Sequence, residues 1–211
     1  MDQNQLVALI TEAVAKHLCH NFGVSKIPVA ISNRHVHLSQ EDMDRLFGAN
    51  HRFKVLKNLA QPGQFAYEEQ VTLVGPKGVI EKVRILGPAR PKTQVEISIS
   101  DGIKLGVKAP IRDSGELAKS ASLTLVGPLG STTLPEGTII AARHIHMHPE
   151  DAARFGVKDK DRINVKAPGN RSLVFNEMLV RVSDKYKLEM HIDIDEANAA
   201  YLKNNDFVEI V

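Results

Sequence analysis

The sequence predicts a mainly β protein with short helices, built from two pseudo-related β-barrels and preceded by an N-terminal amphipathic helix. Three observations support this fold class. Short runs of alternating apolar residues follow one another from Val29 onward, Gly-Pro or Pro-Gly pairs separate them, and two motifs occur twice. Short strands cut by turns at such a spacing are typical of barrels and sandwiches.

The N-terminal helix is predicted by residues 2–18, in which apolar side chains recur at spacings of three and four. Phe22 and Gly23 end this pattern, so residues 1–22 are expected to form an amphipathic helix and a linker. Two interpretations stay open. The helix either packs on the body of the protein or on a second subunit, or it is a detachable targeting helix.

Two repeated motifs predict the elements that follow. The sequence VTLVGPKG at 71–78 recurs as LTLVGPLG at 123–130, and each copy predicts a strand that ends in a tight turn. The sequence RHVHLSQED at 34–42 recurs as RHIHMHPED at 143–151. Ser39 can cap a helix in the first copy, Pro149 suits the first helical turn in the second, and each copy therefore predicts a strand, a cap and a short helix.

Composition excludes several classes of protein. Lys+Arg 27 against Asp+Glu 25 gives a formal charge of +2 without a strongly basic block, which argues against a general nucleic-acid binder. A single cysteine excludes an internal disulfide framework and suits a reducing compartment. No apolar run approaches the ~20 residues that cross a bilayer, and the N-terminus lacks the features of a secretory signal. We therefore expect a soluble intracellular protein that binds neither nucleic acid nor membrane.

The histidines of the second motif predict metal binding. Side chains alternate along a strand, so His35 and His37 lie on one face about 6.6 to 6.8 Å apart, close enough for both imidazoles to bind one ion at about 2.0 to 2.1 Å. His144 and His146 repeat the pattern. A single His-X-His pair is a weak signal and is more often a pair of polar residues on a solvent face, but a second copy in the same context favours metal.

The remaining ligands are expected from other strands, because a catalytic zinc takes about three protein groups. Glu96 lies opposite the apolar face formed by Val95, Ile97 and Ile99. His191 alternates with apolar residues in 189–195. Asp193 is a candidate to orient His191. The alternatives are a rim carboxylate for Glu96 and a surface histidine for His191. His148 is expected at a helix cap rather than in a metal site.

A family resemblance is carried by seven motifs in order: SNRHVHLS (32–39), LAQPGQFA (59–66), VTLVGPKG (71–78), RILGPAR (84–90), QVEIS (94–98), ARHIHM (142–147) and LEMHIDIDEANAA (188–200). Together they closely resemble the PduL-type phosphate propanoyltransferases, the phosphotransacylases of bacterial microcompartments. The resemblance implies conversion of acyl-CoA and phosphate to acyl phosphate and CoA, with a short acyl group and propionyl as the family default.

The resemblance also implies a dinuclear zinc site with two Zn²⁺ per chain. One zinc would take His35, His37 and Glu96, and the other His144, His146 and His191. One barrel is expected over 34–141, with a lid-like excursion at 48–68, and the other from 24–33 together with 142–211. Arg90 is the first candidate for a phosphate contact. Weaker phosphate or CoA candidates are Ser32, Lys57, Arg84 and Ser114.

The partners expected from the resemblance are coenzyme A, acyl-CoA and phosphate, with a homodimer or larger assembly. Residues 1–22 would be an encapsulation helix that contacts the shell or cargo, which places the protein in the lumen of a bacterial microcompartment in the cytoplasm. Two other functions remain open. The same ligands suit a dinuclear zinc hydrolase of thioesters or amides, and a non-enzymatic barrel protein could use the metal for stability.

Overall fold

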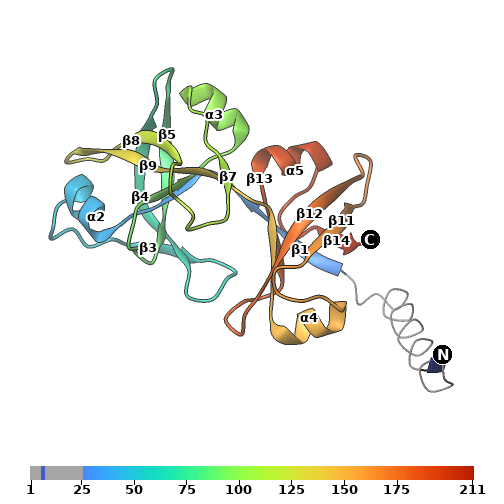
Figure 1. Ribbon diagram of the computed structural model, residues 1–211. Coiled ribbons are helices and arrows are strands. Elements are labelled where there is room, and N and C mark those ends of the chain that lie inside the picture. The colour runs from blue at the N-terminus through green and yellow to red at the C-terminus, as the bar shows by residue number, and fades with distance from the viewer. Residues whose placement is uncertain (1–5, 8–25) are drawn as a thin grey trace. The chain divides into compact units, whose positions relative to one another are not determined.

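The computed structural model describes residues 6–7 and 26–211 (Figure 1). Residues 26–211 form fourteen strands and four short helices, which confirms the prediction of a mainly β fold. The predicted helix over 2–18 lies outside the described residues except for Leu6 and Val7, which are helical and exposed. Within the described part of the chain, no helix is long and apolar enough to span a membrane.

The described residues divide into two compact units. The terminal unit contains the residues up to Ala30 together with Arg143–His191 and Ala199–Val211. The central unit contains Ile31–Ala142 and Ile192–Asn198. Each unit holds its own closed barrel of strands, so the predicted pair of barrels is confirmed.

Six strands form the terminal barrel. Their order around the ring is β1 (Lys26–Ser32), β13 (Glu189–Asp193), β10 (His144–Met147), β12 (Leu173–Val182), β11 (Arg162–Ala167) and β14 (Phe207–Ile210). Alternate side chains of these strands fill the interior and are at most 1% exposed: Ile27, Val29, Ile145, Met147, Met178, Val180, Met190 and Val208. The core is therefore aliphatic and rich in methionine.

The central barrel is also a ring of six strands. Their order is β4 (Phe65–Val74), β5 (Val79–Gly87), β2 (His35–His37), β6 (Gln94–Glu96), β9 (Ser131–Ala141) and β8 (Ala121–Val126), which returns to β4. Two further strands extend it: β3 (Val55–Asn58) pairs with β4, and β7 (Ile111–Arg112) pairs with β9. The interior again follows the alternation of the sequence. Leu123 and Leu125 are buried, while Thr124 meets Thr133 across the pair at 2.8 Å on the exposed face.

The repeated VGPxG motifs form the turns of two hairpins, as predicted. Gly75 N–H donates to the Gly78 carbonyl in the β4–β5 hairpin, and Gly127 N–H donates to the Gly130 carbonyl in the β8–β9 hairpin, both at 2.9 Å. The duplicated sequence therefore encodes a duplicated hairpin within one barrel.

Each hairpin turn packs on the end of a helix. Lys77 N–H donates to the carbonyl of Leu105 at the end of α3 (Ile99–Leu105), and Leu129 N–H donates to the carbonyl of Leu46 in α2 (Gln40–Phe47), both at 3.0 Å. A Cβ at Gly75 would lie 2.3 Å from the Leu105 carbonyl oxygen. Glycine is required at this position because a side chain would collide with the helix backbone.

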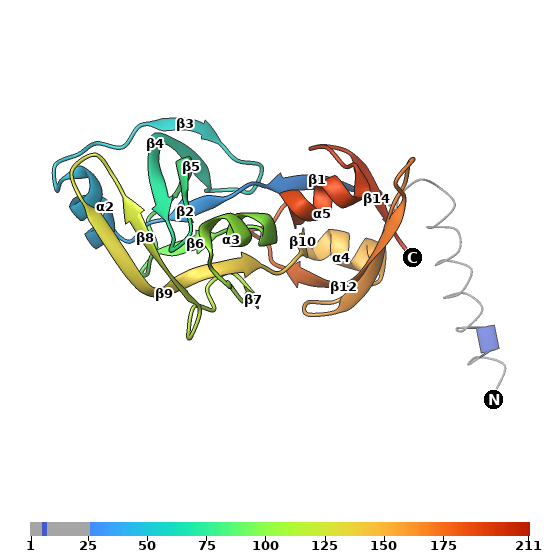
Figure 2. The ribbon, with the colours of Figure 1, turned by 90° about the horizontal axis from the view of Figure 1, so that it is seen from above.

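Two copies of a strand–cap–helix unit lie in the central barrel, one running from β2 to α2 and the other from β6 to α3 (Figure 2). Ser39 Oγ accepts from Asp42 N–H in the first copy, and Ser98 Oγ accepts from Asp101 N–H in the second, both at 3.2 Å. The predicted cap at Ser39 is thus confirmed. The second copy was not predicted.

Two strands of the terminal barrel repeat this arrangement: β10 leads to α4 (Pro149–Phe155), and β13 leads to α5 (Ile194–Ala200). Residues 192–198 of the second copy are grouped with the central unit. His148 caps α4 by accepting from Glu150 N–H, with Pro149 in the first turn as predicted. Asp193 caps α5 by accepting from Glu196 N–H at 2.9 Å. The main chain therefore leaves the extended conformation after Asp193.

Two local sequence interpretations were wrong for the same reason. Ile99 was taken as the inward continuation of a strand, but it begins α3 and is 54% exposed. Residues 189–195 were taken as one strand, whereas Asp195 belongs to α5. Alternating apolar residues continue into the first helical turn in both copies, so the pattern of period two extends past the true end of the strand.

Candidate metal centres

The central barrel brings together three of the predicted ligands. Strands β2 and β6 pair antiparallel, with His35 opposite Glu96 and His37 opposite Gln94. The ligand atoms of His35, His37 and Glu96 all lie within 4.8 Å of one another. His35 Nε2 is 3.4 Å from Glu96 Oε2, and the two imidazole centroids are 5.1 Å apart. We call these three residues the central group.

Two of the predicted phosphate residues contact the central group. The Arg90 guanidinium lies 2.9 Å from His37 Nε2 and donates to Ser114 Oγ at 3.1 Å. Ser114 Oγ in turn donates to Glu96 Oε1 at 3.1 Å. A main-chain bond from Arg90 N–H to the Leu38 carbonyl at 2.9 Å anchors the arginine beside β2. A guanidinium and a hydroxyl therefore adjoin the ligand atoms.

Burial keeps His37 in the form that binds metal. His37 is 3% exposed, and burial followed by the charges of His35 and Arg90 lowers the pKa of His37 to about 2. The imidazole is consequently neutral at physiological pH. A neutral imidazole keeps the lone pair that metal coordination requires.

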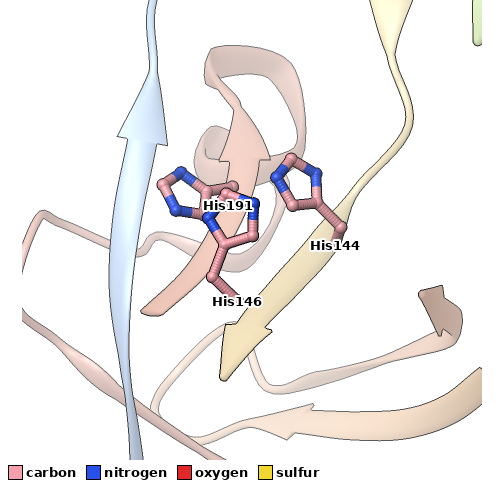
Figure 3. A group of neighbouring side chains, drawn as sticks. All are labelled: His144, His146 and His191. Carbon is pink, nitrogen blue, oxygen red and sulfur yellow. The ribbon is translucent and has the colours of Figure 1, made fainter. Parts of the chain in front are cut away.

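The terminal barrel brings together the other three predicted ligands. Strands β10 and β13 pair antiparallel, with His144 opposite His191 and His146 opposite Glu189. The ligand atoms of His144, His146 and His191 lie within 4.8 Å of one another, and Figure 3 shows the three rings facing a common point. The ring centroids are separated by 4.7 to 5.0 Å. We call these residues the terminal group.

The surroundings of the terminal group lower the pKa of His146, as those of the central group lower the pKa of His37. The Tyr186 ring stacks on His146 with centroids 4.1 Å apart. Burial, followed by the charges of His144, His191 and Arg181, lowers the pKa of His146 to about 2. His146 is therefore also neutral at physiological pH, and the aromatic ring fixes the plane of its imidazole.

Unpaired buried atoms test whether these groups fit a metal ion. In residues 26–211, the buried side-chain atoms without a hydrogen-bond partner are His37 Nδ1, His146 Nδ1, His191 Nε2 and Thr138 Oγ1. Three of these four belong to the two groups, and a buried polar atom left unpaired costs about 1 to 3 kcal/mol. The donor sets of two nitrogens with one oxygen and of three nitrogens suit zinc with one open position. Both groups therefore fit a metal ion.

The other predicted residues have the following positions. Arg84 lies opposite His35 in the β2–β5 pair, and its guanidinium donates to the main-chain carbonyls of Tyr67 and Glu68 at 2.9 and 2.7 Å. Lys57 is exposed on β3, and Ser32 is half-buried at the end of β1. Of the phosphate candidates, Arg90 and Ser114 are thus the two with side-chain hydrogen bonds to the central group in the described residues.

Three residues of the sites escaped sequence reasoning. Gln94 donates to Glu96, Glu189 Oε2 lies 3.2 Å from His191 Nε2, and Tyr186 stacks on His146. The carboxylate beside His191 is therefore Glu189, while Asp193 caps α5. A signal for Gln94 and Glu189 did exist, because each lies two residues before a predicted ligand on the same strand. Nothing local in the sequence indicated Tyr186.

The fold and the two groups define the class of the protein: a double-barrel β protein with one candidate metal centre in each barrel. A family model described as "Phosphate propanoyltransferase" matches residues 28–203. The chain is 53% identical over 186 residues to a phosphate propanoyltransferase of Thermotoga maritima, which covers 88% of this chain and 89% of the relative. It is 45% identical over 209 residues to one of Clostridioides difficile, covering 99% and 98%.

A third relative, from Listeria monocytogenes and also named phosphate propanoyltransferase, is 44% identical over 200 residues, covering 95% of this chain and 92% of the relative. The chain belongs to the phosphate propanoyltransferase family, a family of acyltransferases.

Proposed function

We propose that this protein is a phosphotransacylase that converts a short-chain acyl-CoA and phosphate to acyl phosphate and CoA, with propionyl-CoA as the expected substrate. Membership of the phosphate propanoyltransferase family supports the reaction. The single structural observation that carries the proposal is the contact of Arg90 with His37 and Ser114 beside buried ligand atoms. A guanidinium fork at that position suits a tetrahedral oxyanion such as phosphate.

The chemistry asks for positioning and charge more than for proton transfer. Phosphate is already an anion near neutral pH, and a thiolate is a fair leaving group. A phosphate oxygen attacks the thioester carbonyl carbon, and the carbon–sulfur bond then breaks to release the CoA thiolate. Arg90 would hold the attacking phosphate in place, and Ser114 would supply a further hydrogen bond.

The metal that we propose is zinc, with two ions per chain. His35, His37 and Glu96 would hold one, and His144, His146 and His191 the other, as the donor chemistry of both groups allows. When bound, the ions supply Lewis-acid stabilisation of the carbonyl oxygen and of the departing sulfur. Ser32, Lys57 and Arg84 are proposed as weaker contacts for phosphate or CoA.

The reaction is tested by supplying propionyl-CoA to the zinc-loaded protein with and without phosphate. We expect release of free thiol to require phosphate and to be matched by equal formation of acyl phosphate. Thiol release that is indifferent to phosphate would instead identify a zinc thioester hydrolase. Absence of both reactions, in a protein that loses its fold on chelation, would favour a non-enzymatic protein that uses the metal for stability.

The setting of the enzyme is a further part of the proposal. Residues 1–22 would direct the protein to the lumen of a bacterial microcompartment by contacting shell or cargo, and the protein would form a homodimer or larger assembly. The barrels would correspond to 34–141, with 48–68 as a lid, and to 24–33 with 142–211. Deleting residues 1–22 should leave the catalytic rate unchanged and abolish co-purification with shells. Co-purification of the truncated chain would contradict the targeting role.

A further inference from the structure

The two copies of the strand–cap–helix unit in each barrel place different residue types at equivalent positions, so comparison of residue identities does not reveal their correspondence. When the two copies in the central barrel are aligned at their caps Ser39 and Ser98, Gln94 corresponds to His35 and Glu96 corresponds to His37, four and two residues before the cap. Glu96 is therefore the internal counterpart of a histidine ligand. Gln94 is the internal counterpart of the other histidine ligand, His35.

The terminal barrel shows the same correspondence. Alignment at the caps His148 and Asp193 sets Glu189 in the position of His144 and His191 in the position of His146. The third ligand of each group, Glu96 or His191, thus comes from the second copy of the unit. The residue two positions before it, Gln94 or Glu189, corresponds to the first histidine of the His-X-His pair.

Each group is consequently three corners of a four-cornered arrangement on two antiparallel strands. His37 faces Gln94 across β2 and β6, and His146 faces Glu189 across β10 and β13. We call Gln94 and Glu189 the fourth corners. Their equivalence follows from the strand register of both barrels.

Gln94 is fixed at its corner by hydrogen bonds. It is 1% exposed, and its amide nitrogen donates to Glu96 Oε1 at 2.5 Å and to Ser114 Oγ at 2.9 Å. Its amide oxygen accepts from Gly115 N–H at 2.8 Å. Glu96 Oε1 is thereby held by Gln94 while Glu96 Oε2 faces His35. The amide fixes which carboxylate oxygen points into the central group.

Glu189 has the corresponding place in the terminal barrel. Its Oε2 lies 3.2 Å from His191 Nε2, and the side chains of Glu189 and His191 are only 13% and 16% exposed. In both barrels, the fourth corner therefore contacts the third ligand of its own strand. The two pairings differ in chemistry: an amide donates a hydrogen bond to a carboxylate in the central barrel, and a carboxylate lies beside an imidazole without a hydrogen bond to its Nε2 in the terminal barrel.

We propose that Gln94 and Glu189 are equivalent positioning residues that orient the third ligand of each metal centre and give each centre one carboxylate. The assignment rests on the metal binding of the proposed function. Glu96 is the carboxylate of the central centre, and Glu189 is the carboxylate of the terminal centre. Outer partners of this kind commonly contribute ten- to 100-fold to metal affinity.

The test is the zinc affinity of purified full-length variants, measured by competition with a chromophoric chelator. Gln94→Met and Glu189→Met remove the fourth corners at similar volume, and Glu189→Gln removes only the charge. Each should weaken one of the two zinc sites by about ten- to 100-fold and leave the other unchanged. Glu189→Gln should lie between the wild type and Glu189→Met.

Matched controls separate this effect from a general one. Gln40→Met removes an exposed amide that donates to Asp44, and Glu177→Gln removes a carboxylate whose side chain is 71% exposed on β12. Both should keep wild-type affinities. If Gln94→Met loses its far-ultraviolet circular dichroism, Gln94→Asn keeps the amide, shortens its reach and should still weaken one zinc site.

Three results would overturn the assignment. Wild-type affinity at both sites in folded Gln94 and Glu189 variants would show that the corners do not position the ligands. A shift of the cobalt absorption bands of the Co²⁺-substituted Glu189→Gln variant to a different ligand field would make Glu189 a direct ligand instead. A wild-type chain that binds no zinc would overturn the metal centres themselves, so failure of the proposed function is distinguishable from failure of this inference.

Discussion

Arg90 is the residue whose chemistry most directly separates phosphate transfer from other uses of the same fold. Its guanidinium touches both His37 and Ser114, and the second of these contacts Glu96. Hydrogen bonds to a charged group contribute about 1.5 to 3 kcal/mol. Loss of the fork should therefore affect phosphate specifically, because the acyl-CoA carbonyl offers no comparable anion.

We expect Arg90→Ala to raise the KM for phosphate by about ten- to 100-fold, the equivalent of the charged hydrogen bonds lost, with a much smaller change in the KM for acyl-CoA. Arg90→Lys keeps the charge but not the fork and should recover only part of the loss. Steady-state kinetics at varied phosphate measure the effect, with the exposed Arg52→Ala as control. An unchanged phosphate KM in Arg90→Ala would remove this residue from phosphate binding.

The buried histidines predict how stability depends on pH. The pKa of His37 and of His146 is lowered from 6.5 to about 2 in the folded chain. Between about pH 2 and pH 6.5, the unfolded chain therefore binds more protons than the folded chain. The free energy of unfolding of the metal-free protein consequently falls as the pH drops below about 6.5. The effect disappears about one pH unit above 6.5, where the unfolded imidazoles also lose their protons.

Thermal unfolding of chelator-treated protein at pH 7.5, 6 and 5 measures this dependence, and the midpoint should fall with each step. His37→Gln should show a shallower fall, since it lacks one of the two groups. The matched control is His51→Gln, which replaces an exposed histidine outside both groups. A midpoint independent of pH would contradict the buried, neutral state of these imidazoles.

At the scale of the element, the N-cap of α3 is expected to contribute to the free energy of unfolding. Helix α3 follows directly after the strand that carries Glu96. Ser98 and Asp101 form a reciprocal capping box. We expect Ser98→Ala to lower the free energy of unfolding by about 1 kcal/mol. Urea denaturation compares it with Ser100→Ala, an exposed serine in the first turn. Equal stabilities of the two variants would show that the box contributes nothing.

The elements that could be predicted from the sequence are those with a distinctive local pattern of side chains. The VGPxG turns, the cap at Ser39 and the two His-X-His strands all combine a local pattern with a repeat. The second copies around Ser98 and Asp193 were missed because they share backbone geometry and caps rather than residue identities. Glu96 and His191 were nevertheless proposed as ligands, since each polar side chain alternates with apolar neighbours.

Site residues that do not belong to a local sequence pattern could not be predicted from the sequence. Tyr186 stacks on His146 only because the segment after β12 returns to the barrel. Gln94 and Glu189 acquire their places from the antiparallel register of strands that lie far apart in the chain. Strand register depends on tertiary packing, and a single sequence does not specify it.

At the scale of the whole molecule, the two barrels share one arrangement: two strand–cap–helix units, three candidate ligands and a fourth corner that we propose as their support. In each barrel the His-X-His pair lies on the first unit and the third candidate ligand on the second, a carboxylate in one barrel and an imidazole in the other. We infer that both centres are needed for transfer, because negative charge develops on the carbonyl oxygen as phosphate attacks and on the sulfur as the thiolate leaves.

The most direct measurement of that claim is a zinc titration of the metal-free, full-length protein, followed by phosphate-dependent thiol release from propionyl-CoA. The account predicts no transfer without metal, recovery on addition of zinc and a plateau at about two zinc ions per chain, one for each three-ligand group. Full activity in the metal-free protein, or a plateau at a single zinc, would contradict it.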